Sequence, residues 1–344
     1  MSDEAKVRPA SAKALAWPMF DRIVAEGLDG TGEYTNPWVR EESGALRYAP
    51  DYGTLERLLG VPLYLQAATT TGVPALALDV WLAYELRRAG FSPDSVWPRA
   101  THPRILPGPI VALLDALPRA QAHALRERLT KNGNVRGVTA ASANILGKNY
   151  SKQVDVIMAD WSTGPELMIS TKRMDSSYGK NAPNRVEESY GDAKNLRLRH
   201  PLAALGFAFG LRNDVFEKEK DVAEWLFDLL GKLGREDDAY HGTCVILMEY
   251  GADVPPPADA GVADEDGIVP AGPDVEPGDE EAPIDLSDVE LDLPLGMLPR
   301  VRVDHARTPP ELSPAVFLAT MVNQVLDTTP VAMHREARAR RRAA

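Results

Sequence analysis

The amino-acid sequence predicts an α/β (α+β) protein in which a mixed central sheet is flanked by helices and preceded by a helical N-terminal region. Two observations carry this prediction. Short apolar segments of strand length recur through the middle of the chain, and charged segments with apolar residues at helical spacing separate them. The resulting order is helix, three strands, helix, strand, helix, strand. That order is typical of a sheet covered by helices.

Composition limits the class of protein. The chain has 344 residues, of which 44% are hydrophobic and 26% charged, as in ordinary globular proteins. The single cysteine, Cys244, excludes an intrachain disulfide framework and is expected in the core. No apolar segment has the length that spans a bilayer, and residues 1–18 lack the apolar core of a signal peptide. We therefore expect a cytoplasmic protein with no membrane partner.

Charge and composition divide the chain. The formal net charge is −12, but fourteen acidic and no basic residues lie in 251–299, so the rest carries +2. This segment is rich in proline and glycine, which predicts a largely disordered acidic linker. A helical region (1–108) and a core (109–250) precede it. A C-terminal part (300–344) follows and ends in an arginine-rich tail that we expect to bind phosphates non-specifically.

The N-terminal region reads as interrupted helices over 17–66, to which we assign no chemistry. The clearest helix is 74–88, which has proline at its start and Gly90 just past its end. Its apolar stripe predicts a core position for Trp81 and a solvated position for Glu85.

A proline-rich connector at 93–109 follows, and it precedes a helical region at 110–129 and an expected strand at 135–140. Arginines beside an aromatic residue on a loop can contact nucleic acid, but we favour a packed surface loop here. The residues concerned are Trp97, Arg99, His102 and Arg104.

The centre of the chain holds the candidate chemistry. Two strands, 153–158 and 166–172, form a predicted hairpin that brings Asp155 next to Lys172. Ser170 and Lys172 point to the same face, because side chains alternate along a strand. Beyond the hairpin, 203–211 and 243–250 read as buried strands separated by a helix at 220–233. The chain returns through a strand at 301–303 and a helix at 313–326.

After the hairpin we expect a polar loop at 175–181 and a helix that opens near Pro183 and carries Arg185, Glu187 and Glu188. Two carboxylates and a lysine at a sheet edge are what metal-assisted phosphodiester cleavage requires. The alternative is structural. A lysine at a strand end can be a solvated gatekeeper, and carboxylates early in a helix are favoured by its macrodipole.

This pattern resembles the PD-(D/E)xK nuclease superfamily, and most closely the restriction endonucleases in which Ser-x-Lys replaces Glu-x-Lys. In that branch the missing carboxylate lies on the following helix. The matching residues are Asp155, Ser170-Thr171-Lys172 and Asn184-Arg185-Val186-Glu187. The resemblance covers about a third of the chain. Val154 stands where the family usually has proline, and the length of the gap after Lys172 leaves Glu188, or Glu166 on the strand, as alternatives to Glu187.

The resemblance implies a restriction-endonuclease-like catalytic core at 109–250 and a Mg²⁺-dependent DNA endonuclease acting in restriction or phage defence. Asp155 and Glu187 would bind the metal, Lys172 would organise the attacking water, and Ser170 would support the site. Symmetric cleavage of a duplex would suggest a homodimer. A non-catalytic DNA-binding or assembly subunit and an RNA nuclease remain as alternatives. The expected DNA contacts are Arg173, Lys180, Asn181, Arg185 and Lys194.

Overall fold

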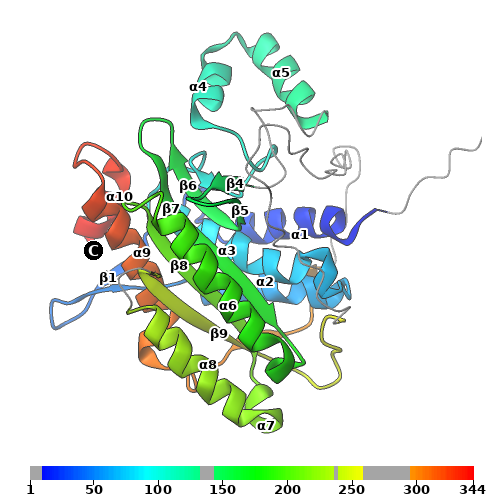
Figure 1. Ribbon diagram of the computed structural model, residues 1–344. Helices are drawn as coiled ribbons and strands as arrows, with labels where there is room; N and C mark the ends of the chain where they lie inside the picture. The colour runs from blue at the N-terminus through cyan, green and yellow to red at the C-terminus, as the bar shows by residue number, and fades with distance from the viewer. Residues whose placement is uncertain (1–9, 132–142, 236–238, 259–294) are drawn as a thin grey trace, which may run out of the picture.

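The computed structural model describes residues 10–131, 143–235, 239–258 and 295–344, and it confirms the α/β class. A mixed six-stranded sheet runs through the molecule with helices on both faces (Figure 1). Its strands β7, β8 and β9 are parallel, whereas β3, β6 and β10 pair antiparallel to their neighbours. In sheet order the strands are β10 (Val301–Val303), β9 (Gly242–Tyr250), β8 (Ala204–Arg212), β7 (Gly164–Met174), β6 (Val156–Asp160) and β3 (Val96–Trp97).

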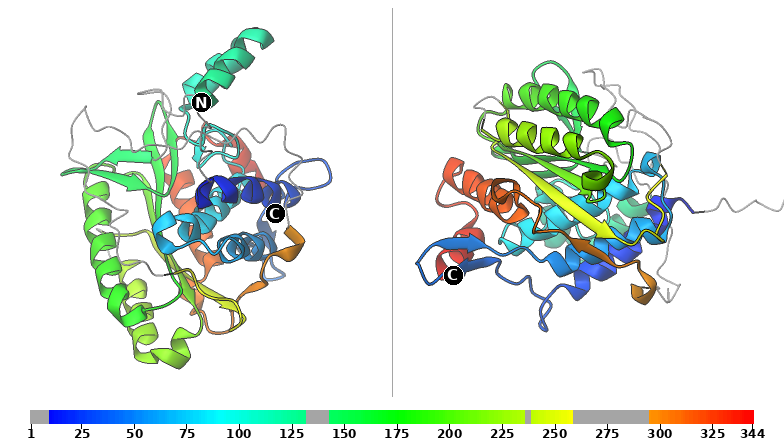
Figure 2. Two further views of the ribbon diagram at one scale, coloured as in Figure 1. Left: turned by 90° about the vertical axis from the view of Figure 1, so that its right-hand side faces the viewer. Right: turned by 90° about the horizontal axis from the view of Figure 1, so that it is seen from below.

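One face of the sheet is covered by α6 (Tyr178–Arg197) and α8 (Lys220–Leu233), which lie side by side in Figures 1 and 2. Parallel strands need a crossover, and these helices lie in the connections from β7 to β8 and from β8 to β9. Strand β8 is buried along its whole length, as expected for an inner parallel strand with both faces covered.

The opposite face is covered by segments from both ends of the chain. A single apolar cluster on this side runs from Ala16 to Ala337 and includes Leu167 and Ile169 of β7. The helices before residue 108 therefore share one core with the sheet and with the C-terminal helices. The helices of this face are α1 (Ala12–Glu26), α2 (Tyr52–Tyr64), α3 (Val73–Arg88) and α9 (Pro314–Thr328).

Two expected boundaries at the centre are wrong. The strand expected over 153–158 breaks at Asp155, because β5 pairs with β4 in a separate two-stranded sheet and β6 begins only afterwards. The helix expected to open near Pro183 begins at Tyr178. Gly179 N–H donates to Glu219 Oε2 at 2.7 Å, so the cap of α6 comes from a distant residue that no local pattern contains. The small sheet is formed by β4 (Ala143–Leu146) and β5 (Ser151–Val154).

The arginine-rich end forms a docked helix, α10 (Arg335–Ala343). Gly90 lies against it with φ of +97°, and a Cβ added to Gly90 would meet the Ala337 backbone at 2.8 Å. Arg338 Nη2 donates to Leu326 O at 2.7 Å, and Arg340 Nη1 donates to two more carbonyls. These two arginines therefore hold the chain end in place instead of forming part of a free tail.

The strand expected at 135–140 lies wholly outside the described residues. Most of the expected acidic linker, residues 259–294, also lies outside them. Trp81 and Cys244 are fully buried, as expected. The remaining elements are β1 (Trp38–Arg40), β2 (Leu46–Tyr48), η1 (Thr69–Thr71), α4 (Gly108–Ala116), α5 (Arg119–Lys131), α7 (Val215–Lys218), η2 (Leu295–Met297) and η3 (Pro310–Leu312).

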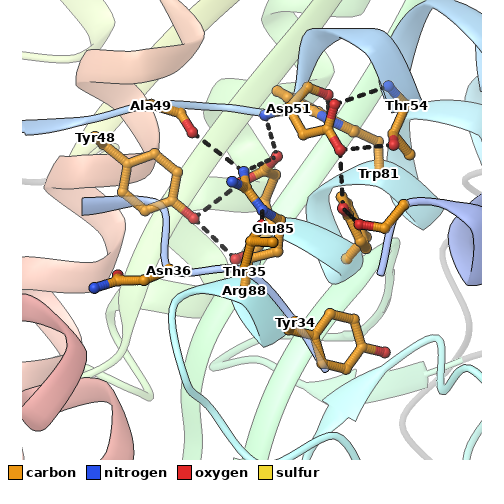
Figure 3. A network of polar contacts seen from close by, with 12 residues as sticks. Tyr34, Thr35, Asn36, Tyr48, Ala49, Asp51, Thr54, Trp81, Glu85 and Arg88 are labelled. Atoms are coloured by element: carbon orange, nitrogen blue, oxygen red, sulfur yellow. Dashed lines mark hydrogen bonds and ion pairs between the residues drawn. The ribbon is translucent and has the colours of Figure 1, made fainter. Parts of the chain in front are cut away.

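A buried polar network ties α3 to the segment around β2 (Figure 3). Glu85, expected to be solvated, is fully buried, because α3 lies between other helices and the sheet. Its carboxylate accepts from Arg88 Nη1 at 2.9 and 2.8 Å, from Asp51 N at 2.7 Å and from Tyr48 Oη at 3.1 Å. Burial raises the pKa of Glu85 to about 7, and the Arg88 charge acts against this rise.

Arg88→Met is expected to lower the free energy of unfolding by about 3–5 kcal/mol, because it leaves the Glu85 carboxylate buried without its cation. Urea unfolding followed by circular dichroism measures this loss. Arg22→Met is the matched control. Its ion pair with Glu26 is exposed, so a change of about 0.5 kcal/mol or less is expected. Equal losses for the two variants would show that the buried pair contributes no more than the exposed one.

Candidate active site

Asp155 lies in the break between β5 and β6, where the chain passes from the small sheet to the large one. Its Oδ2 accepts a hydrogen bond from the backbone N–H of Thr171 at 2.7 Å, which fixes the carboxylate beside β7. Met168 of β7 belongs to the cluster under α6 and α8. Ser170 and Lys172 share the parity of Met168, so they face the α6 side.

Charged groups of β5, of α6 and of the break between β5 and β6 act on Lys172. Burial lowers the pKa of Lys172, and the carboxylate charge of Asp155 acts against this lowering. The charges of Lys152 and Arg185 lower the pKa further, whereas Glu188 on α6 raises it. The sequence therefore correctly placed Asp155 and Lys172 together, and the structure adds Glu188 to the pair.

The phase of α6 separates the two adjacent glutamates. Neighbouring helix residues differ by about 100° in direction, so Glu187 and Glu188 cannot face the same way. Glu187 is exposed on the outer surface. Glu188 Oε2 is buried without a hydrogen-bond partner, 3.8 Å from Arg185 Nη1. The glutamate whose charge acts on Lys172 is thus Glu188, the alternative left open beside the preferred Glu187.

The reason lies in the buried face of α6, which sets the helix rotation. Ala182, Val186 and Ala193 pack into the apolar cluster beneath the helix. Beside this apolar stripe, polar residues follow one another at intervals of three or four positions. Residues at this spacing lie on one side of a helix, which we call the polar flank. This spacing was visible in the sequence and would have selected Glu188 over Glu187. The flank consists of Asn181, Arg185, Glu188, Asp192 and Asn195.

Glu166, the other alternative, lies outside this site. It sits at an irregularity in the pairing of β6 with β7, so the regular alternation that would align it with Lys172 does not hold. Its carboxylate accepts from Thr163 Oγ1 at 2.7 Å and lies 3.0 Å from His334 Nε2. Six residues of extended strand, about 20 Å, separate it from Lys172.

A carboxylate that the sequence analysis missed reaches β7 from the other face. Thr171 Oγ1 donates to Asp79 Oδ1 of α3 at 2.5 Å, and both side chains are buried. Burial, and then the nearby charge of Asp155, raise the pKa of Asp79. An acidic residue within the apolar stripe of the helix at 74–88 was the available signal.

A second lysine holds the small sheet against α6. Lys152 Nζ lies 2.7 Å from Asp192 Oδ2, and Tyr150 Oη donates to Asp192 Oδ1 at 2.9 Å. Asn195 Oδ1 accepts from the backbone N–H of Asn149 at 2.8 Å. These contacts fix β5, and therefore the position of Asp155 that follows it, relative to α6.

Arg173 is not available for DNA, contrary to expectation. Its side chain is buried in an ion pair with Asp175, with Nε to Oδ2 at 2.8 Å and Nη2 to Oδ1 at 3.0 Å. The other expected contacts lie on α6. Lys180 and Lys194 are exposed on its outer surface. Asn181 and Arg185 lie on the polar flank.

The described residues contain no group of three or more His, Cys, Asp and Glu side chains arranged to hold a metal. Mg²⁺ requires fewer protein ligands, because it retains waters and takes oxygens from substrate phosphates. Two features fit a cation here: the buried Glu188 oxygen without a hydrogen-bond partner, and the negative charge of Asp155, which raises the pKa of Asp79.

Comparison with protein-family models, with curated proteins and with solved structures yields no match in any of the three. Within the described part of the chain, no helix combines the length and apolar character needed to cross a bilayer. The functional argument therefore rests on the geometry of the site itself.

Proposed function

We propose that this protein is a Mg²⁺-dependent DNA endonuclease of the restriction-endonuclease-like class, acting in the cytoplasm in restriction or phage defence. One observation carries the proposal. The Asp155 carboxylate is held beside β7 by a 2.7 Å hydrogen bond from the Thr171 N–H, and Glu188 of α6 has a buried oxygen; the charges of both act on Lys172. Carboxylates and a lysine at the edge of a sheet are suited to metal-assisted attack on a phosphodiester.

In this mechanism Asp155 and Glu188 would hold Mg²⁺, which when bound polarises the phosphate and acidifies water. The Thr171 N–H holds the Asp155 carboxylate in one orientation through the 2.7 Å hydrogen bond. Lys172 orients the attacking water, or donates to the phosphoryl oxygen that gains charge in the transition state. Ser170 supports the polar surface on the same face of β7.

A projecting pair of helices supports a nucleic-acid partner. Helices α4 and α5 extend away from the body of the molecule in Figures 1 and 2. They are joined by a small apolar cluster of their own, and α5 is almost wholly exposed. Arg119 and Arg128 lie on its surface. Exposed arginines on a projecting helix can follow a phosphate backbone without reading its sequence.

The double variant Arg119→Gln, Arg128→Gln is expected to weaken duplex binding about tenfold and to reduce the salt dependence of log K by about 1–2. Fluorescence anisotropy with a labelled duplex at several salt concentrations measures both quantities. Lys220→Gln, Lys232→Gln on α8 is the matched control, because these lysines are exposed but lie far from α5 in Figure 1. An equal effect of the control would exclude the projecting helices as the contact.

The activity itself is tested by incubating the purified protein with supercoiled plasmid and Mg²⁺, with EDTA and duplex RNA as controls. Nicking that requires Mg²⁺ and is restricted to DNA supports the proposal. Binding without any nicking would instead favour a non-catalytic DNA-binding or assembly subunit. One observation favours that second candidate: the described residues contain no group of three or more His, Cys, Asp and Glu side chains that could hold a metal.

A further inference from the structure

A cavity of about 150 Å³ lies between α1, α3 and the connector that carries Pro98. A cavity of about this volume can hold a ligand the size of benzene. It is separate from the candidate active site. Asp79 of α3 points to β7, whereas Val80 and Arg87 of the same helix line the cavity.

Three arginines gather around this cavity with only two carboxylates to balance them. Arg99 Nη2 lies 2.6 Å from Asp94 Oδ1, and Arg104 Nη2 lies 2.7 Å from Asp21 Oδ2. Arg87, which is only 3% exposed, forms no ion pair with any carboxylate of the described residues. One buried positive charge at the cavity is therefore unbalanced.

One nitrogen of the Arg87 guanidinium is buried without a hydrogen-bond partner. Arg87 Nη2 donates to the carbonyls of Val96, at 3.4 Å, and of Pro98, whereas its Nε is buried without a partner. Burial lowers the pKa of Arg87 to about 10. Tyr34, which also hydrogen-bonds with the guanidinium, acts against this lowering, whereas the charges of Arg104 and Arg99 lower the pKa further. The guanidinium is still charged at neutral pH, so an anion in the cavity would remove a large unfavourable term.

Apart from Arg99 and from Asp21, whose carboxylate is paired with Arg104, the remaining lining suits a flat apolar group. Trp17 and Tyr34 contribute rings, and Val24, Leu28 and Val80 contribute aliphatic surface. The Trp17 indole is already held in place, because the Arg104 guanidinium stacks over it at 3.9 Å from the ring centroid. A ligand would therefore meet a largely preformed wall, which lowers the entropic cost of binding.

We propose that this cavity binds a small organic oxyanion with a flat apolar body, of the chemical class of aromatic carboxylates. The carboxylate pairs with the Arg87 guanidinium and neutralises its charge, and the body of the ligand contacts Trp17, Tyr34 and Val80. This binding does not depend on nuclease activity, and its readout is independent of DNA.

Isothermal titration of the full-length protein with benzoate, and with its neutral isostere benzamide, tests the proposal. We expect saturable binding of benzoate and binding of benzamide that is at least tenfold weaker, because only the carboxylate pairs with the guanidinium. Arg87→Met should weaken benzoate binding at least tenfold and leave benzamide unchanged. Ala25→Trp, at an exposed position of the lining, should block benzoate without altering Arg87.

Inorganic phosphate is the third probe. It carries negative charge but no flat apolar body, so it tests whether the charge alone is recognised. Weaker binding of phosphate than of benzoate supports an aromatic carboxylate, whereas phosphate binding in place of benzoate overturns that assignment. Equal affinities for benzoate and benzamide, unchanged binding by Arg87→Met, or no binding at millimolar benzoate would each overturn the proposal. If Arg87→Met fails to fold, undiminished binding by Ala25→Trp serves as the contradicting result.

Discussion

Lys172→Ala is expected to abolish Mg²⁺-dependent nicking of plasmid DNA while duplex affinity changes by no more than about threefold. One lysine contributes little to an interface with many phosphates, but its charge acts on the oxygen that becomes negative in the transition state. Loss of such a donor typically lowers kcat by about 10²–10³, or about 2.7–4 kcal/mol of barrier. Single-turnover nicking rates, measured beside anisotropy titrations of the same protein, separate the two quantities.

Two comparisons make this result interpretable. Lys172→Met retains most of the aliphatic stem, so an inactive but stable Lys172→Met protein attributes the loss to the charge and not to packing. Lys232→Ala removes an exposed lysine paired with Asp228 and should cut at the wild-type rate. Wild-type cleavage by Lys172→Ala would show that the assigned site is wrong.

Glu188→Gln is expected to remove Mg²⁺-dependent cleavage, whereas Glu187→Gln should reduce it by about twofold at most. An amide has nearly the same shape as a carboxylate but loses the negative charge that Mg²⁺ requires. Glu188 has a buried oxygen and acts on the pKa of Lys172, whereas the side chain of Glu187 is exposed. Nicking rates across a Mg²⁺ titration measure the difference, since a lost ligand also raises the Mg²⁺ concentration needed.

The two adjacent residues serve as each other's matched control, because both substitutions alter one charge on one turn of α6. Glu166→Gln extends the comparison to the strand and should leave the rate unchanged, since Glu166 contacts Thr163 and His334 away from Lys172. An active Glu188→Gln protein beside an inactive Glu187→Gln or Glu166→Gln protein would contradict the geometric assignment.

Local patterns were sufficient for much of the site. The period-2 alternation of β7 placed Ser170 and Lys172 on one face, because that property belongs to a single strand. Proximity of Asp155 to Lys172 also followed from the sequence, since a hairpin joins neighbouring segments. The end of β5 did not follow from the sequence. Asp155 marks the point where two separate sheets meet, and one carboxylate among strand-forming residues gives no sign of that change.

By itself the sequence determined the α/β class, the buried strands β8 and β9, and the proximity of Asp155 to Lys172. Only the tertiary structure decided which glutamate faces that pair, because the rotation of α6 is set by packing against the sheet. It also brought Asp79 to Thr171 and collected three arginines around two carboxylates beside α1. These groupings join residues far apart in the chain, and contacts of that kind depend on how whole elements pack rather than on any local period.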